Sequence, residues 1–365
     1  MGFKCGIVGL PNVGKSTLFN ALTKTAAAPA ANYPFCTIEP NTGDVAVPDP
    51  RLARIAQIAK SKEVIPTRLT FVDIAGLVRG ASKGEGLGNQ FLANIRETDA
   101  IAHVVRCFED GDVTHVEGGV NPVRDAEIID TELMLADLES LEKRVPNLEK
   151  RAAARDKGAQ AVLPLMKAVL QLLRDGKPAR LLDVDKEDAK AFAGLNLITS
   201  KPVLYVCNVD EESAAGGNEH SAKVEALAAE QGAGCVTISA AIEAEIAQLP
   251  LEEQAEFLEM NGLDEAGLDR LIRAGYDLLH LQTYFTAGPK ETRAWTFTQG
   301  TKAPGAAGII HTDFERGFIR AQTIGYEDYV ALGGEGGAKE AGKARDEGKE
   351  YVVQDGDVML FKFNT

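Results

Sequence analysis

The chain of 365 residues has few cysteines and no long apolar segment. Its five cysteines are odd in number, scattered and without metal-ligand spacing, which argues against a disulfide framework or a zinc site and favours reduced thiols in the cytosol. No apolar run approaches the ~18 residues that a membrane-spanning helix needs. The N-terminal residues have the pattern of a strand rather than of a signal peptide. We therefore expect a cytoplasmic protein with no membrane partner.

Positive charge is also in short supply. Lys and Arg total 39 against 54 Asp and Glu, and the net charge is −15. Broad binding to phosphate backbones depends on clustered Lys and Arg, so this balance argues against general nucleic-acid binding and gives no reason to expect DNA as a partner. Any basic patch must be local. The length predicts two or three domains with a substantial core.

What the sequence does contain is the octapeptide G-L-P-N-V-G-K-S at residues 9–16. It matches the phosphate-loop motif G-x-x-x-x-G-K-[ST], and it lies between a strand-like run at 4–8 and a helical pattern at 16–24. In this context backbone N–H groups and a helix N-terminus form an anion site. Lys15 is expected to reach the outer phosphates, and the Ser16 hydroxyl is expected to bind Mg²⁺. The motif predicts a nucleoside triphosphate site.

Four further strand-like runs alternate with helical stretches, at residues 69–73, 100–107, 202–207 and 235–239. This alternation predicts a parallel α/β sheet. Ligands of such sheets bind beyond the carboxyl ends of the strands, where three of these four runs carry residues suited to nucleotide chemistry.

The first of these ends carries D-I-A-G, residues 73–76. The Asp73 carboxylate is placed to hold a Mg²⁺-bound water, and the Gly76 N–H to meet the γ-phosphate. Thr37 lies between the two motifs and is the natural hydroxyl to complete the Mg²⁺ shell, although it could be an ordinary surface threonine.

Leu77 follows Gly76, where many GTPases have a glutamine that orients the attacking water. Because leucine cannot hydrogen-bond water, hydrolysis is expected to be slow or to use another group. His115, in a polar loop, is our candidate; Arg79, Lys83 and His103 are alternatives, and His103 fits a packed core position better.

The run at 202–207 ends in N-V-D-E, where GTPases carry the guanine-reading N-K-x-D. Val209 replaces the lysine, and Glu211 occupies the aspartate position, where its longer side chain would crowd guanine. A pocket whose polar groups match the hydrogen-bonding groups of one base discriminates strongly against a base with different ones. Ser239 begins the S-A-A that corresponds to a base-supporting segment. Asn208 completes this pocket. Because its guanine-binding motif is altered, the pocket is expected to bind ATP in preference to GTP.

With these motifs in view, the chain closely resembles the YchF (Obg-like) ATPases along essentially its full length. The resemblance is carried by residues 1–17, by F-C-T-I-E-P-N at 35–41, by the block from 73 to 92 and by L-Q-T-Y-F-T-A-G at 281–288. It implies ATP preference on a GTPase architecture, a hydrophobic residue at Leu77, and binding to ribosomes, through the large subunit or a 70S-like particle and its ribosomal RNA. The resemblance also implies redox regulation, and Cys36, beside Thr37, is either a thiol switch or a small buried apolar residue that fills space.

Residues 125–200 form an insertion between the third and fourth nucleotide motifs. Apolar residues recur every three or four positions from 134 to 148 and from 162 to 173, which predicts an antiparallel, coiled-coil-like helical hairpin. Pro146 predicts a kink or break near Val145. Six Lys and Arg between positions 143 and 157 make a basic tip, which is either a solvated helix face or a contact to ribosomal RNA phosphates.

From about residue 281 the pattern changes to short alternating strands at 294–298, 318–323 and 357–363. This region resembles a TGS domain, a small β-grasp module. We therefore predict a P-loop, OBG-type nucleotide-binding domain at 1–280, carrying the helical insertion, and a TGS domain at 281–365.

The leading hypothesis is a slow, Mg²⁺-dependent ATPase that acts as a switch on ribosomes. A GTPase of the same architecture and a ribosome-binding scaffold with nucleotide as a structural ligand remain alternatives. The proposed catalytic residues are Lys15, Asp73, Gly76 and His115, and the proposed metal ligands are Ser16 and Thr37. The proposed nucleotide-binding residues are Asn12, Val13, Gly14, Lys15, Ser16, Thr17, Asn208, Val209, Glu211 and Ser239.

Overall fold

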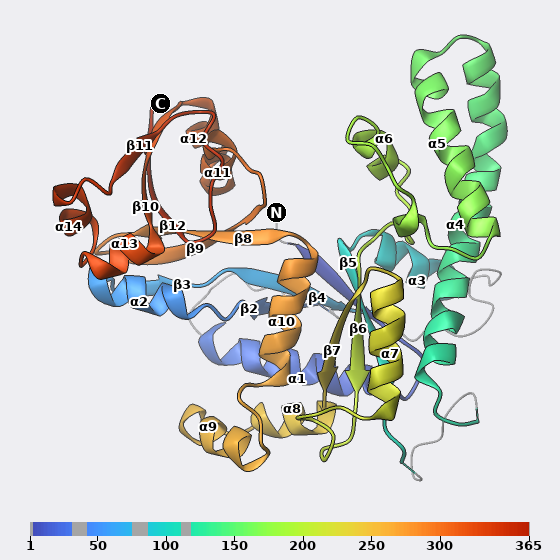
Figure 1. Cartoon of the computed structure of the whole chain (residues 1–365), viewed down its shortest axis with the longest axis horizontal. Coiled ribbons are helices and arrows are strands. Elements are labelled where there is room, and N and C mark those ends of the chain that lie inside the picture. Colours follow the sequence, from blue (N-terminus) through green and yellow to red (C-terminus); the bar gives the residue numbers. More distant parts are fainter. Residues whose placement is uncertain (1–2, 31–41, 75–86, 111–117, 365) are drawn as a thin grey trace. The chain divides into compact units, whose positions relative to one another are not determined.

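The computed structural model describes residues 3–30, 42–74, 87–110 and 118–364. They form two compact units, each built on its own six-stranded sheet (Figure 1). The first unit comprises Met1–Val45 and Thr70–Gly275, and the second comprises Ala46–Leu69 and Tyr276–Thr365. No helix in the described ranges combines the length and apolar composition required to cross a bilayer.

The first sheet has the strand order β2-β4-β1-β5-β6-β7. Neighbouring strands from β4 to β7 are parallel. The bounds are β1 Lys4–Val8, β2 Thr42–Ala46, β4 Arg68–Asp73, β5 Ala100–Arg106, β6 Val203–Asn208 and β7 Gly234–Ile238. Strands β5 and β6 are buried along their whole length, as expected where helices cover both faces of a parallel sheet. The predicted parallel α/β fold is confirmed.

Helices of the first unit follow the strands in the order expected of this fold. They are α1 Lys15–Ala30, α3 Leu87–Arg96, α4 Pro122–Ala153, α5 Lys157–Arg174, the 3-10 helix η1 Ala179–Leu181, α6 Ala189–Ala193, α7 Glu219–Glu230, α8 Ala240–Ile246 and α9 Leu251–Met260. Helix α10, Gly267–Leu278, passes from the first unit into the second. Helix α1 begins at Lys15 itself, directly after the phosphate loop.

Helices α4 and α5 lie side by side as the predicted antiparallel hairpin (Figure 1). Their shared core contains Leu141, Met166 and Val169, all at most 2% exposed. Of the predicted kink or break near Val145, the break is excluded, because α4 continues through Pro146 to Ala153. Val145 and Leu148 pack against the same core, so side-chain packing on both sides of the proline offsets the backbone hydrogen bond that proline cannot make.

The second unit has a mixed sheet with the strand order β11-β10-β12-β8-β9-β3. Its strands are β3 Glu63–Ile65, β8 Leu281–Ala287, β9 Glu291–Thr298, β10 Phe318–Gly325, β11 Arg345–Glu347 and β12 Asp357–Phe363. Its helices are α2 Pro50–Ala59, α11 Ala303–Ile310, α12 Thr312–Arg316, α13 Tyr326–Ala331 and α14 Glu335–Glu340. Two apolar clusters pack in this unit, one including α11 and the other including α2 and α13.

Residues 46–69 belong to the second unit, which differs from the predicted division at residue 281. Helix α2 buries Leu52 and Ile55 against Phe285. Strand β3 pairs in parallel with β9, and the Ser61 hydroxyl donates to the Gly288 carbonyl oxygen at 2.7 Å. This grouping depends on contacts between segments more than 220 positions apart, which local sequence pattern does not encode.

Candidate functional site

The phosphate loop contains two glycines, Gly9 and Gly14, at which there is no space for a side chain. Gly14 has φ of +95°, and a Cβ there would lie 2.3 Å from the Asn208 side-chain nitrogen. A Cβ on Gly9 would lie 2.4 Å from the Val104 carbonyl oxygen. Both glycines are therefore required by close approach. The loop runs directly into α1, so the first N–H groups of that helix face the position of a bound phosphate.

Lys15 is held inside this loop. It is 8% exposed, and its Nζ donates to the Leu10 carbonyl oxygen at 2.7 Å. Burial lowers the pKa of Lys15 to about 8, and the negative charge of Asp73 offsets part of that effect. The ammonium is thus poorly solvated, and phosphate oxygens would be strongly preferred partners for it.

Asp73 ends β4 beside the loop, in register with Ile7 of β1. Burial raises the pKa of Asp73, and the nearby positive charge of Lys15 opposes the rise. Ser16 is exposed at the start of α1. A hydroxyl at the start of α1 and a carboxylate at the end of β4 are oxygen donors of the kind that Mg²⁺ takes together with phosphate oxygens, so the residues present fit that ion. In the part of the chain that the structure describes, no cluster of three or more acidic, His or Cys side chains could hold a metal by itself.

Asn208 joins three segments of the site. Its Nδ2 donates to the Val13 carbonyl oxygen at 2.9 Å, and its Oδ1 accepts from the Ala240 N–H at 2.9 Å. The side chain is 5% exposed. Asn208 therefore fixes the phosphate loop against the segment that begins at Ser239, in addition to lining the base pocket predicted for it.

A cavity of about 730 Å³ opens between these segments. This volume is within the range of small-molecule sites. The cavity is lined by seven of the residues predicted to bind nucleotide: Asn12, Gly14, Thr17, Asn208, Val209, Glu211 and Ser239. The structure thus brings together the ends of β1, β6 and β7, as the topology rule for parallel sheets requires.

The cavity lining combines apolar residues with polar ones, including five acidic residues: Glu109, Asp110, Asp210, Glu211 and Glu212. Val209 is 3% exposed and presents an apolar surface where the guanine motif has a lysine. The Ser239 hydroxyl is buried and has no hydrogen-bond partner among the described residues. Glu211 is exposed at the rim, and the Asp210 carboxylate accepts from the Ser213 N–H at 2.8 Å and so shapes the loop. Ser239 is thus available to a ligand.

The segment after β5 supplies a wall of the cavity that the sequence analysis missed. Phe108, Glu109 and Asp110 all line it, and Phe108 is the only aromatic ring among the described residues of the lining. A local signal existed, since an aromatic residue follows a buried strand at its carboxyl end. The sequence pattern alone did not separate it from an ordinary loop residue.

Several predicted residues lie outside the described residues. These are Thr37, Gly76, Leu77 and His115, together with Cys36, Arg79 and Lys83. His103, the alternative water-positioning group, is 2% exposed in β5, and its ring lies 5.3 Å from that of Tyr205. Burial lowers the pKa of His103 to about 4, so it is a neutral core residue.

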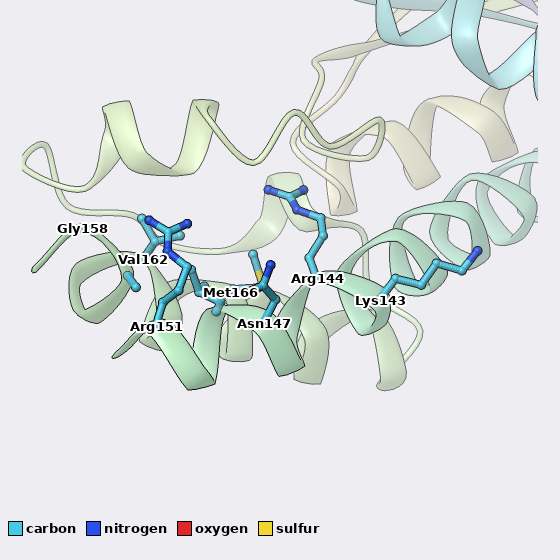
Figure 2. A pocket seen from close by; sticks show the side chains of 9 residues that line it. Lys143, Arg144, Asn147, Arg151, Gly158, Val162 and Met166 are labelled. Atoms are coloured by element: carbon cyan, nitrogen blue, oxygen red, sulfur yellow. The ribbon is translucent and has the colours of Figure 1, made fainter. Parts of the chain in front are cut away.

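A second, basic cavity of about 480 Å³ lies on the helical hairpin (Figure 2). Lys143, Arg144 and Arg151 line it from α4, and Val162 and Met166 line it from α5. Each cation is already paired: Lys143 with Glu139, Arg151 with Asp156, and Arg144 with the Leu195 carbonyl oxygen. The basic tip predicted from the sequence is therefore a surface with an apolar floor and flanking cations.

Two family models match the chain. Residues 4–150 match MMR_HSR1, described as "50S ribosome-binding GTPase". Residues 281–364 match YchF-GTPase_C, described as "Protein of unknown function (DUF933)".

Curated relatives extend over the full length. The chain is 59% identical over 364 residues to a Pasteurella multocida protein and 56% identical over 366 residues to a Bacillus subtilis protein, each named "Ribosome-binding ATPase YchF", with all of both chains covered. Among solved structures it is similar to the Schizosaccharomyces pombe YchF GTPase, with a TM-score of 0.88, 39% identity, and 99% of this chain and 98% of that chain covered.

Proposed function

The chain belongs to the YchF family, and on that premise we propose that it is a Mg²⁺-dependent ATPase that converts ATP to ADP and phosphate and binds ribosomes. The observation that supports this most directly is the cavity beside the phosphate loop. The chain has the complete G-x-x-x-x-G-K-S loop, and the cavity beside it includes a base pocket in which Val209 and Glu211 replace the lysine and aspartate of the guanine-binding motif.

In this mechanism the chain positions the phosphates of ATP and neutralises their negative charge. Lys15 leaves the Leu10 carbonyl and pairs with the outer phosphates, while the loop N–H groups hold the phosphate oxygens. Ser16 and Thr37 would hold Mg²⁺, and Asp73 would hold a water bound to that ion, which neutralises charge on the phosphates when it is bound. Gly76 is proposed to donate its N–H to the γ-phosphate, and His115 to orient the attacking water.

At the base end, the amide of Asn208 and the hydroxyl of Ser239 face the cavity, and Phe108 offers an apolar ring. Adenine presents an acceptor at N1 and a donor at its 6-amino group, so it can be satisfied by a hydroxyl and a rim carboxylate such as Glu211. Guanine would need the aspartate that is absent here.

The remaining proposals concern partners and place. We propose that the chain acts in the cytoplasm, that the unit containing residues 281–365 is a TGS-type module, and that the hairpin cavity contacts ribosomal RNA of the large subunit or a 70S-like particle through phosphates. The cations of that cavity and the mention of a 50S ribosome in the matched family description support this contact.

A GTPase of the same architecture is the second candidate, because the matched family model and the S. pombe relative are both described as GTPases. The deciding experiment is competition of unlabelled ATP and GTP for the purified protein with Mg²⁺, followed by phosphate release from each. Preferential ATP binding with measurable release is expected. A preference for GTP would replace the proposal by the second candidate, and tight ATP binding with no release would indicate a scaffold that uses nucleotide as a structural ligand.

A further inference from the structure

Arg106 is among the largest fully buried side chains in the described part of the protein. It is the last residue of β5, directly opposite Asn208 in the register of β5 and β6. A buried guanidinium loses its hydration and is retained only where the surroundings compensate for that loss. Arg106 does not line the nucleotide cavity, so direct ligand contact does not explain its burial.

Arg106 contacts the segment after β5, residues 108–110, which forms one wall of the nucleotide cavity. Its Nε donates to the Phe108 carbonyl oxygen at 3.1 Å, and its Nη2 donates to the Asp110 carbonyl oxygen at 3.2 Å. Its guanidinium carbon lies 4.5 Å from the centroid of the Phe108 ring. One side chain therefore holds both the backbone of this segment and the face of its aromatic ring.

The start of the same segment is fixed from two other sides. The Cys107 N–H donates to the Asn208 carbonyl oxygen at 2.8 Å, and the Cys107 carbonyl oxygen accepts from Asn218 Nδ2 at 2.7 Å. Beyond Cys107, Arg106 anchors the wall through the Phe108 and Asp110 carbonyl oxygens. Since the guanidinium covers one face of the Phe108 ring, the other face and the edge are left for the cavity.

We propose that Arg106 is a positioning residue for the nucleoside: it orients the Phe108 ring as the platform for the base of bound ATP without touching the nucleotide. This inference rests on the proposed function, and it adds a residue that acts on base affinity and leaves the phosphate subsite unchanged. Stacking of a base on an aromatic ring contributes substantially to binding, but only when the ring is held in place.

The test compares Arg106→Met, Phe108→Ala and the double variant by calorimetric titration with ATP and with inorganic tripolyphosphate, which has no base. Arg106→Met should weaken ATP binding about fivefold and Phe108→Ala about tenfold, given the usual energies of cation–ring and base–ring contacts. Tripolyphosphate affinity should stay within about twofold in all three variants, because this ligand lacks the base that the ring contacts. The double variant should match Phe108→Ala alone, because Arg106 acts through that ring.

Arg293→Met is the matched control, because Arg293 also lies over an aromatic ring, 4.3 Å from the centroid of Trp295, in the other unit. It should leave both affinities unchanged. Should Arg106→Met fail to fold, Arg106→Lys retains the charge but cannot reach both carbonyl oxygens, and it should show the same selective loss of ATP affinity to a smaller degree.

Equal losses for ATP and tripolyphosphate, or additive losses in the double variant, would overturn the inference and make Arg106 a general structural residue. ATP affinity unchanged in Arg106→Met would overturn it as well. Absence of ATP binding by the wild-type protein would instead contradict the proposed function, so the two failures are distinguishable.

Discussion

The side-chain amide of Asn208 donates a hydrogen bond to the Val13 carbonyl oxygen at 2.9 Å, across 195 positions of sequence. The same side chain accepts from the Ala240 N–H. Asn208→Ala would leave a buried carbonyl and a buried N–H without these partners, at a cost of about 1–3 kcal/mol for each group. We expect lower stability in urea denaturation and weaker ATP binding.

Asn208→Asp is the informative companion to that variant. Its carboxylate can still accept from Ala240, but it cannot donate to Val13 and would repel that carbonyl oxygen. It should therefore be at least as impaired as Asn208→Ala in ATP affinity. Wild-type affinity in both variants would show that the bond between these segments is not needed for the site.

Lys15 provides a prediction about pH. Burial lowers its pKa to about 8 in the nucleotide-free protein, whereas phosphate oxygens favour the charged ammonium and raise the pKa on binding. ATP affinity should therefore be full below this value and fall as the pH rises above it, with uptake of a proton on binding at about pH 9. Calorimetric titrations in buffers of different ionisation enthalpy measure this uptake.

Lys15→Met removes the titrating group, so its proton uptake at the same pH should vanish and its turnover should be abolished. Proton uptake that persists unchanged in Lys15→Met would assign it to another group. Unchanged turnover would remove Lys15 from the proposed catalytic residues.

Two substitutions in the base pocket should shift the preference of the protein from ATP towards GTP. Val209→Lys combined with Glu211→Asp recreates N-K-x-D, with the shorter carboxylate that accepts from guanine. The ratio of GTP to ATP affinity should rise by at least about tenfold, because unmatched buried polar groups dominate such discrimination. Glu212→Asp, at a neighbouring rim position of the same cavity, is the control and should leave the ratio unchanged. An unaltered ratio in the double variant would place base selection elsewhere in the cavity.

The nucleotide unit was predictable because its signals are local. The G-x-x-x-x-G-K-S loop, the strand ends at Asp73 and Asn208, and the apolar period of the hairpin all lie within short windows. The structure has the loop between β1 and α1, strands that end at Asp73 and Asn208, and helices α4 and α5 at these positions. Parallel-sheet topology then places the strand ends together.

What could not be predicted depends on contacts between distant segments. Helix α2 carries an amphipathic pattern, but nothing in that pattern says that Leu52 packs against Phe285 rather than in the first unit. Phe108 lines the cavity because β5 and β6 are neighbours in the sheet, and this pairing is not evident from the sequence around Phe108. The continuity of α4 through Pro146 likewise reflects packing against α5, which overrides the local preference of proline.

The segment 46–69 should stabilise the second unit through Arg51. This guanidinium bonds both Asp49 and Asp355, at 2.8 and 2.6 Å, and lies over the Phe285 ring. Arg51→Met would leave Asp49 and Asp355 without their shared cation, and it should lower the free energy of unfolding by about 1–3 kcal/mol.

Trp295, the chain's single tryptophan, belongs to this unit, so its fluorescence during urea denaturation reports the effect. Arg54→Met on the same helix is the control, since the hydrogen bond that Arg54 makes to Gln57 is exposed, and it should change stability little. Equal stability of the two variants would contradict a structural role for Arg51.

The hairpin offers a prediction about ribosome binding that is separate from nucleotide chemistry. Lys143 and Arg151 line the basic cavity, and their ion pairs with Glu139 and Asp156 are exposed, so replacing both by alanine should cost the fold little. If they contact RNA phosphates, the double variant should bind ribosomes about tenfold more weakly and show a shallower dependence of affinity on salt.

Cosedimentation with ribosomes at several salt concentrations measures both quantities, and ATP turnover without ribosomes should be unchanged. Lys167→Ala removes a hairpin cation that does not line the cavity, and it should retain wild-type binding and salt dependence. Because phosphate contacts release counterions, a loss of affinity with an unchanged salt slope would point to a protein partner instead. Wild-type ribosome binding by the double variant would instead support the other interpretation of the basic tip, a solvated helix face.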